Sequence, residues 1–316
     1  MIIVIGEALI DLIQDRYNPT SYNAVVGGAN ANVAIALARR GTPHTFLARI
    51  STDSFGQQIT EKLKKNNVNT DHSIKTDEPS TLAVVSIGPN GSPSYSFYVN
   101  GTADWGWTKE ELPLLEAEAI QFGCLTMAME PGNLVIEEWA KAQSHEKTIS
   151  HDINMRPALG FDQQKELERV RRVNEFSHII KASDEDLEWL DPEKTPDQTA
   201  IEWSTNKLVL ITKGADGTDV YKNNQFLFNV PSRKINVVDT VGAGDTFTAN
   251  LLGQLQEAGH LGTNPTDKLM NLNEETLRTF VHTAGIAASI TCERAGAEPP
   301  TKLELSLASS ANLTGL

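Results

Sequence analysis

The stretch Asp239-Thr240-Val241-Gly242-Ala243-Gly244-Asp245-Thr246-Phe247 carries more information about fold and function than any other part of this 316-residue chain. Three small residues at its centre leave backbone N–H groups unshielded, and residues 246–253 can continue as a helix. A helix that begins here directs unpaired N–H donors and the positive end of its dipole toward one point. The stretch therefore predicts a phosphate-binding turn.

The carboxylate of Asp245 is unexpected in such a turn, because it repels a phosphate. It is explained if Asp245 accepts a proton from a nucleophilic hydroxyl beside that phosphate, as in phosphoryl transfer. Since a helix start favours the ionised form of an acid, we expect Asp245 to be an ionised, weak base. The alternative is an ordinary loop with an Asp in the first turn of a helix, and spacing alone leaves it open.

Composition describes an ordinary globular protein, with 40% hydrophobic and 22% charged residues. The length allows one α/β domain, or one with a small appendage. A net charge of −14 argues against nucleic acid and anionic membranes as partners. It also means that an anionic ligand needs local positive potential in the site.

Several features indicate a cytoplasmic protein. Cys124 and Cys292 are too few for a disulfide framework and fit a reducing compartment. The apolar start Met1–Ile5 is soon followed by Glu7 and lacks a basic flank, which predicts a buried strand and not a signal peptide. No apolar run approaches membrane-spanning length.

Strand-like and helix-like segments alternate along most of the chain. The predicted strands are Ile2–Ile5, Phe46–Ile50, Thr148–Ile153, His178–Lys181 and Leu208–Thr212. The predicted helices include Ala31–Arg40, Leu134–Ala142 and Gln163–Asn174. This alternation predicts an α/β fold with a mostly parallel sheet covered on both faces.

Two segments break the alternation. Thr81–Ile87 and Ser94–Val99 flank Gly88-Pro89-Asn90-Gly91, which predicts a β-hairpin standing off the main sheet as a flap. Its edge would need covering by a substrate, a closing motion or a second subunit. We expect the least regular structure at Gly259–Leu272, which has Gly, Asn and Pro but little periodicity.

Polar residues near predicted strand ends and at a helix start suggest a sugar site, because ligands of open parallel sheets bind at the carboxyl ends of the strands. Asp11 follows the first strand, Gly27 and Gly28 open the first helix with Asn32, and Arg156 follows a later strand. A carboxylate, an amide and bare backbone suit the hydroxyls of a neutral polyol. Alternatively, Asn32 faces solvent in a first helical turn and Arg156 is a surface ion-pair partner.

The candidate nucleotide site is less distinct. Thr212-Lys213-Gly214-Ala215-Asp216-Gly217 follows a strand and could turn around a nucleotide, but it could equally be a turn between two strands. Ser183-Asp184-Glu185-Asp186 could be no more than helix capping. The chain has no P-loop motif, protein-kinase motif set, H-E-x-x-H metal motif or G-x-G-x-x-G after the first strand, which argues against those enzyme classes.

In this order, the motifs resemble those of the ribokinase-like (PfkB) sugar kinase family over nearly the whole chain. Asp239–Asp245 is similar to the D-T-x-G-A-G-D signature, Gly27–Asn32 to G-G-x-x-x-N, and Arg294–Pro299 to R-x-G-A-x-P. Ser51–Gly56 matches G-x-D-x-x-G except that Ser51 replaces the first Gly. The resemblance implies one domain, residues 1–316, with a three-layer ribokinase-like fold, a mostly parallel central sheet and a small antiparallel β-lid. The lid would come mainly from about residues 72–104, and many relatives dimerise through it.

The resemblance also implies roles for individual residues. Asp245 would be the catalytic base, and the anion hole would consist of Gly242, Ala243 and Gly244. The sugar site would be lined by Asp11, Gly27, Gly28, Asn32, Phe97 and Arg156. The ATP site would be formed by Ser183, Thr212, Lys213, Gly214, Gly217, Gly242 and Gly244. Mg²⁺ would accompany ATP, with an indirect contribution from Asp186, and a monovalent cation such as K⁺ would bind Asp239, the Val241 carbonyl and the 294–297 loop.

Within the family, the sequence is most similar to bacterial fructokinases, which implies transfer of the γ-phosphate of ATP to a primary hydroxyl of D-fructose. The similarity lies in residues 6–11, 97–104, 154–159 and 181–187. Ser183 and Asp186 replace the usual Asn and Glu of N-x-x-E, which puts metal geometry there in doubt. Val99 stands where relatives that bind acidic sugars, and many fructokinases, have Arg. The alternatives are a kinase of ribose or 2-keto-3-deoxygluconate and, more distantly, a non-catalytic sugar-binding protein.

Overall fold

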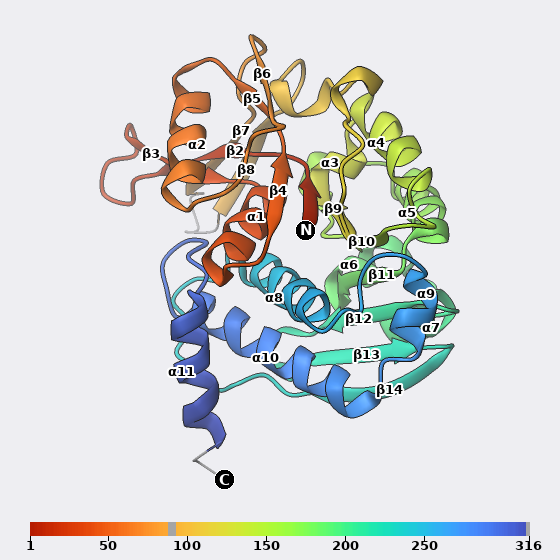
Figure 1. The fold of residues 1–316 in the computed structure, drawn as a ribbon. Coiled ribbons are helices and arrows are strands. Elements are labelled where there is room, and N and C mark those ends of the chain that lie inside the picture. The colour runs from red at the N-terminus through yellow and green to blue at the C-terminus, as the bar shows by residue number, and fades with distance from the viewer. Residues whose placement is uncertain (88–92, 314–316) are drawn as a thin grey trace.

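A central eight-stranded sheet organises the computed structural model, which describes residues 1–87 and 93–313 (Figure 1). The strand order is β14-β13-β12-β11-β10-β9-β1-β4. The parallel strands are β1 (Ile2–Ile5), β4 (His44–Leu47), β9 (Ala119–Gly123), β10 (Thr148–Asp152), β11 (Ile179–Ser183) and β12 (Leu208–Thr212). At one edge β13 (Thr218–Lys222) and β14 (Gln225–Val230) add two antiparallel pairings. The predicted mostly parallel sheet is confirmed.

Helices cover both faces of this sheet because successive residues of its strands point to opposite sides. Ile2 and Val4 of β1 belong to one apolar cluster, and Ile3 and Ile5 belong to another. The first face carries α1 (Ala29–Arg40), α2 (Ser54–Lys65), α8 (Ala243–Glu257), α9 (Pro265–Met270) and α10 (Glu274–Cys292), with α11 (Lys302–Leu313) packed on α10. The other face carries α3 (Cys124–Ala128), α4 (Gly132–Lys141), α5 (Gln163–Phe176), α6 (Asp184–Leu190) and α7 (Pro196–Trp203). The three predicted layers are therefore present (Figure 1).

A second sheet, in the order β3-β2-β7-β8, forms the lid. The predicted hairpin is confirmed as β7 (Leu82–Ile87) paired antiparallel with β8 (Pro93–Tyr98), while its predicted turn at 88–91 lies outside the described residues. The lid is larger than the hairpin. It includes the antiparallel pair β2 (Leu9–Gln14) and β3 (Tyr22–Gly27), and β2 joins β7 in parallel. Asp11 therefore lies within a lid strand.

Two other segments differ from expectation. The predicted strand Phe46–Ile50 divides at Ala48, because β5 (Arg49–Ser51) leaves the main sheet to pair with β6 (Ile74–Thr76). Residues 259–272 contain α9 and the buried side chains of Leu261, Leu269 and Leu272. A helix of six residues is too short to show the periodicity that would have predicted it.

Short 3₁₀ helices complete the described structure at Ala103–Trp105, Lys109–Glu111, Pro157–Leu159 and Gly214–Asp216. Within residues 1–87 and 93–313, no helix is both long enough and apolar enough to cross a membrane.

The 51–56 motif joins helix α2 to the segment before lid strand β7 through the side chain of Asp53. Asp53 is the N-cap of α2, where its carboxylate accepts the Gly56 amide at 2.7 Å. The same carboxylate accepts the Ser80 amide and the Ser80 hydroxyl, both at 2.8 Å. These bonds fasten α2 to the segment that leads into lid strand β7.

We predict that Asp53→Ala lowers the free energy of unfolding by about 2–3 kcal/mol, because it removes a helix cap worth about 1 kcal/mol and two further hydrogen bonds. Asp162→Ala is the matched control, since Asp162 caps α5 through one bond to the Lys165 amide. Urea unfolding monitored by circular dichroism measures both values. Equal losses in the two variants would show that the bonds to Ser80 contribute nothing.

Candidate active site

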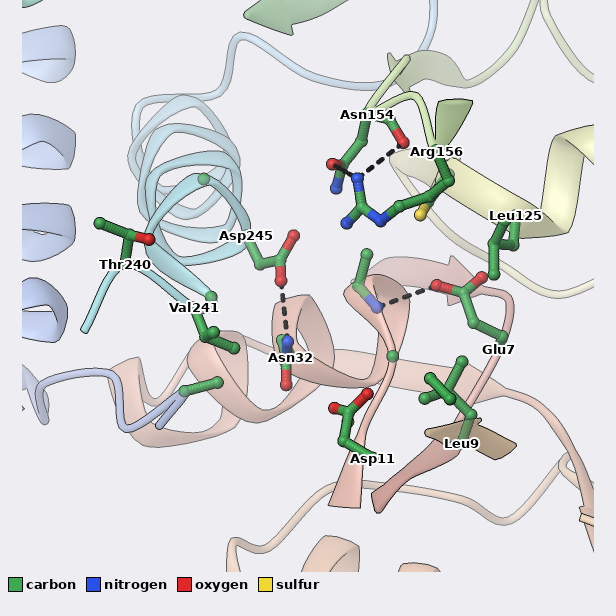
Figure 2. A pocket seen from close by; sticks show the side chains of 18 of the residues that line it. Glu7, Leu9, Asp11, Asn32, Leu125, Asn154, Arg156, Thr240, Val241 and Asp245 are labelled. Atoms are coloured by element: carbon green, nitrogen blue, oxygen red, sulfur yellow. Dashed lines mark hydrogen bonds between the residues drawn. The ribbon is translucent and has the colours of Figure 1, made fainter. Parts of the chain in front are cut away.

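A cavity of about 690 Å³ lies between the lid and the carboxyl ends of the central strands. The lid contributes residues of β2, β3, β7 and β8, and the main body contributes the starts of α1 and α8. Its lining also includes residues at the carboxyl ends of β11 and β12, residues that follow β9 and β10, and residues of the 239–241 and 296–297 segments. Figure 2 shows Asp11, Asn32, Arg156 and Asp245 around this space.

The start of α8 has the geometry expected of an anion-binding turn. Gly242, the N-cap, adopts the left-handed conformation with φ 76°, and a Cβ there would lie 2.5 Å from the Ala297 Cβ. No side chain caps this helix end, so the helix itself supplies no partner for its first amides. The Ala243 amide instead bonds the Thr240 carbonyl at 3.3 Å. The Gly244 amide is therefore the better placed of these two for an anion.

Asp245 is buried in the first turn of α8, with 6% of its surface exposed. Its Oδ2 accepts a hydrogen bond from Asn32 Nδ2 at 2.8 Å (Figure 2). Burial, followed by the charge of Asp152, raises the pKa of Asp245 to about 7. This direction is opposite to the expected one, in which the helix start favours the ionised form, because loss of water on burial disfavours the charged carboxylate. A pKa near neutrality makes Asp245 a better general base than a solvated Asp.

The lid side of the cavity depends on two glycines. A Cβ on Gly27 would lie 2.2 Å from Asp11 Oδ2, and a Cβ on Gly28 would lie 2.6 Å from the Glu7 carbonyl. Gly28 also has a φ of 104°, which favours glycine. Burial raises the pKa of Asp11 to about 6, and the charge of Arg156 acts in the opposite direction.

Asn32 and Arg156 both line the cavity, and the structure does not support the solvent-facing or surface ion-pair alternatives. Asn32 is buried and bonded to Asp245, so it does not face solvent. Arg156 lines the cavity, where its Nη1 donates to Asn154 Oδ1 at 2.6 Å and to the Met155 carbonyl at 2.8 Å. These bonds hold the guanidinium in place, and Figure 2 shows those to Asn154.

Two lid positions differ in their surroundings. Phe97 lines the cavity, as predicted, whereas Val99 is not among the described lining residues. Val99 is buried in an apolar cluster with Trp105 and Leu125. In this structure Val99 does not reach the described cavity lining, so its identity carries no information about the charge of the sugar.

Only some of the residues predicted to contact ATP line the cavity. Ser183, Thr212, Gly242 and Gly244 line the cavity, while Lys213, Gly214 and Gly217 lie outside its described lining. The 212–217 segment is a turn between the antiparallel strands β12 and β13, as the alternative held. Lys213 Nζ pairs with Asp219 at 3.0 Å. Contact of this turn with ATP stays a prediction.

Both carboxylate oxygens of Asp186 accept hydrogen bonds from backbone amides. Its Oδ2 accepts the Ser183 amide at 2.8 Å, its Oδ1 accepts the Met155 amide at 2.7 Å, and Ser183 and Asp186 form a capping box. Both side chains therefore cap the helix, and contact of Ser183 with ATP stays a prediction. Among the described residues, no group of three or more His, Cys, Asp and Glu side chains could hold a metal ion. The donor set therefore fits a magnesium ion only if the ion's other ligands come from water and nucleotide.

Asp239 joins the two loops that the resemblance assigns to a monovalent cation. Its Oδ1 accepts the Val241 amide at 3.1 Å and its Oδ2 accepts the Gly296 amide at 2.8 Å. The 239–241 and 294–297 segments therefore lie together, as that assignment requires. Cation binding itself stays a prediction.

A family model for pfkB family carbohydrate kinases matches residues 1–303. The chain belongs to this family. The kinase is 37% identical over 284 residues to a fructokinase from Rhizobium leguminosarum bv. trifolii, covering 88% of this chain and 86% of that one.

Solved structures agree with this placement. The fructokinase from Xylella fastidiosa with bound ATP superposes with a TM-score of 0.87 over 98% of both chains, and at 24% identity this likeness shows the fold. The fructokinase from Vibrio cholerae O395 with fructose, ADP and calcium ion bound has a TM-score of 0.79 and 25% identity over 97% of both chains.

Sequence reasoning missed two elements of this kinase's site. Glu7 is fully buried, and its carboxylate accepts the amides of Ala29 at 2.9 Å and Thr126 at 3.3 Å. Lys181 forms a buried ion pair with Asp152 beside the start of α8. The available signal was the position of these charged residues in or just after apolar strands, where an unpaired charge is costly.

We predict that Asp245→Asn stabilises the ligand-free kinase at pH 8 but not at pH 4. The pKa of Asp245 is raised in the folded state, so wild type loses stability as the pH rises from about 4 to about 7, and Asn avoids this loss. We expect a gain of a few kcal/mol at pH 8. Urea unfolding at both pH values measures the difference; a gain that is independent of pH would contradict the raised pKa.

Proposed function

We propose that this kinase transfers the γ-phosphate of ATP to a primary hydroxyl of D-fructose. The observation that carries the proposal is the buried Asp245–Asn32 pair at the start of α8, inside a cavity bounded by the lid. The relatives named above support fructose as the sugar. One is a fructokinase that aligns with this chain over 86% of its own length, and another is a fructokinase whose structure holds fructose and ADP.

In the proposed reaction, the sugar lies against the lid side of the cavity. Asp11 and Asn32 offer oxygen and nitrogen atoms to its hydroxyls, and Gly28 permits close approach of the backbone. Arg156, held by Asn154, donates from the opposite wall. Fructose is neutral and rich in hydroxyls, so this mixture of donors and acceptors matches it.

Asp245 removes the proton of the attacking hydroxyl as the phosphoryl group is transferred. Its pKa of about 7 leaves a large fraction ionised at neutral pH, and the burial that raises this pKa also makes it a stronger base. The uncapped start of α8 faces the charge that develops on the phosphoryl group. Magnesium, bound with ATP, would neutralise phosphate charge. We assign ATP contacts to Ser183, Thr212, Lys213, Gly214, Gly217 and the Gly242–Gly244 turn.

Three further features belong to the proposal. The lid covers the sugar and excludes water, which directs the phosphoryl group to the sugar. A potassium ion at Asp239 and the Val241 carbonyl would steady the anion-binding turn. A homodimer would cover the lid, because its side chains Tyr22 and Tyr98, which do not belong to the described cavity lining, are 42% and 61% exposed. The use of ATP and the unpaired cysteines fit a cytoplasmic location.

We predict that Asp245→Asn lowers kcat at least about 10²-fold while ATP and fructose still bind, because only the proton acceptor is lost. ADP release and calorimetric titration with each substrate measure the two effects. Asp104→Asn is the matched control. Asp104 is also buried with its pKa raised to about 7 by burial, but it bonds the Ala8 amide and does not belong to the described lining. Near wild-type turnover by Asp245→Asn would remove Asp245 from the mechanism.

We predict a kcat/KM for fructose more than about 10²-fold above that for 2-keto-3-deoxygluconate, a difference of about 3 kcal/mol. A buried carboxylate on the sugar would need a cationic partner, and Arg156 Nη1 is already engaged by Asn154 and Met155. ADP release over a panel of neutral and acidic sugars, with a sugar-free reaction as control, measures the ratio. A preference for the keto acid or for ribose would refute fructose as the substrate and leave the carbohydrate-kinase class standing.

A further inference from the structure

Two buried charged residues, Asp152 and Lys181, lie beside the start of α8. Asp152, the last residue of β10, is the register partner of Lys181 in β11. Lys181 Nζ lies 2.9 Å from both carboxylate oxygens of Asp152, and the two side chains are only 8% and 6% exposed. Burying two ions is expensive, and such a pair is weak evidence for stability. The pair therefore calls for a functional explanation.

The ion pair contacts the first turns of α8. Thr248 Oγ1 donates to Asp152 Oδ2 at 3.0 Å and lies 3.1 Å from the Gly244 carbonyl. A Cβ on Gly244 would lie 3.3 Å from Lys181 Nζ. Gly244 has no left-handed backbone that would demand glycine. Its missing side chain instead leaves room for the ammonium group, one residue before Asp245.

The cavity has few positive charges. Its described lining includes five acids and two bases: Glu7, Asp11, Asp186, Asp239 and Asp245, with Arg156 and Lys181. Arg156 is held by Asn154 and Met155. Of these two basic residues, Lys181 is the one that lies against the start of α8. Binding of a nucleotide there would add negative charge.

We propose that Lys181 and Asp152 are positioning residues for phosphoryl transfer, whose opposite charges at the start of α8 set the charge state of Asp245. Lys181 favours the ionised carboxylate, and Asp152 opposes it. The inference rests on the proposed function, in which Asp245 accepts the proton of the sugar hydroxyl.

The electrostatics of Asp245 agree with this arrangement. Burial and the charge of Asp152 raise the pKa of Asp245, whereas the Asn32 hydrogen bond and the charges of Lys181 and Arg156 lower it. Two other titratable groups face the same centre. Burial raises the pKa of the Cys124 thiol, which keeps it neutral, and the carboxylate of Asp186 acts on Lys181.

The direct test is a titration of the Asp245 carboxyl carbon by NMR in the ligand-free, full-length protein, with the signal assigned from Asp245→Asn. Lys181→Met should move the midpoint up by about one pH unit, because a stabilising positive charge is lost. Asp152→Asn should move it down by about one pH unit, because a repelling negative charge is lost. The double variant loses both charges and should titrate close to wild type.

Kinetics provide a second readout. The acid limb of the pH profile of kcat/KM for fructose should shift to higher pH in Lys181→Met and to lower pH in Asp152→Asn. Arg169→Met and Glu166→Gln are matched controls, because Arg169 and Glu166 form an equally buried pair, 7% and 8% exposed, within α5. These controls should leave the Asp245 midpoint unchanged even if they destabilise the fold.

Midpoint shifts in the same direction for both single variants, or no shift in either, would overturn the proposal. If Lys181→Met does not fold, Asp152→Asn and the double variant still test the proposal. The Asp245 midpoints of these two variants must differ by the contribution of the Lys181 charge. A wild-type protein that phosphorylates no sugar would refute the proposed function, and the carboxyl titration would still test the ion pair.

Discussion

The hydrogen bond between Asn32 and Asp245 is the contact on which the site depends. It is 2.8 Å long and joins the first turns of α1 and α8, which are 213 residues apart in sequence. Asp245 is buried, so its carboxylate needs a partner, and Asn32 supplies one from the neighbouring helix. The lid strand β3 runs through Gly27 into α1. One bond therefore joins the lid side of the cavity to the start of α8.

Several acids that line the cavity also hold the backbone of its loops and helix starts. Glu7 bonds the amides at the starts of α1 and α3, Asp186 bonds those of Ser183 and Met155, and Asp239 bonds those of Val241 and Gly296. Each holds a loop or helix start where irregular backbone would otherwise leave amides without partners. The chain's excess of acid thus partly reflects the architecture of the site. Asp245 differs from these three acids because its carboxylate bonds the side chain of Asn32 and not a backbone amide.

Sequence reasoning predicted features that depend on neighbouring residues and missed those set by distant packing. The glycine-rich turn, the strands with continuous apolar runs and the β7–β8 hairpin were all predictable from local pattern. The burial of Asp245 and the pairing of Lys181 with Asp152 were not, because both arise when β10, β11 and α8 meet. The same limit applies to the surroundings of Val99, which come from four separate segments. Ser183, in contrast, is a local cap and was readable as one.

The β2–β3 hairpin has a consequence for the evolution of this fold. Its two ends meet at the base, since Gly28 packs against the Glu7 carbonyl and the Ala29 amide bonds the Glu7 carboxylate. Its tip, residues 15–21, is exposed or half-buried. With the base pinned in this way, the tip can be lengthened, shortened or given a new binding loop without displacing the catalytic pair. The hairpin is thus a natural insertion point, through which related enzymes could acquire new substrates or regulators around unchanged chemistry.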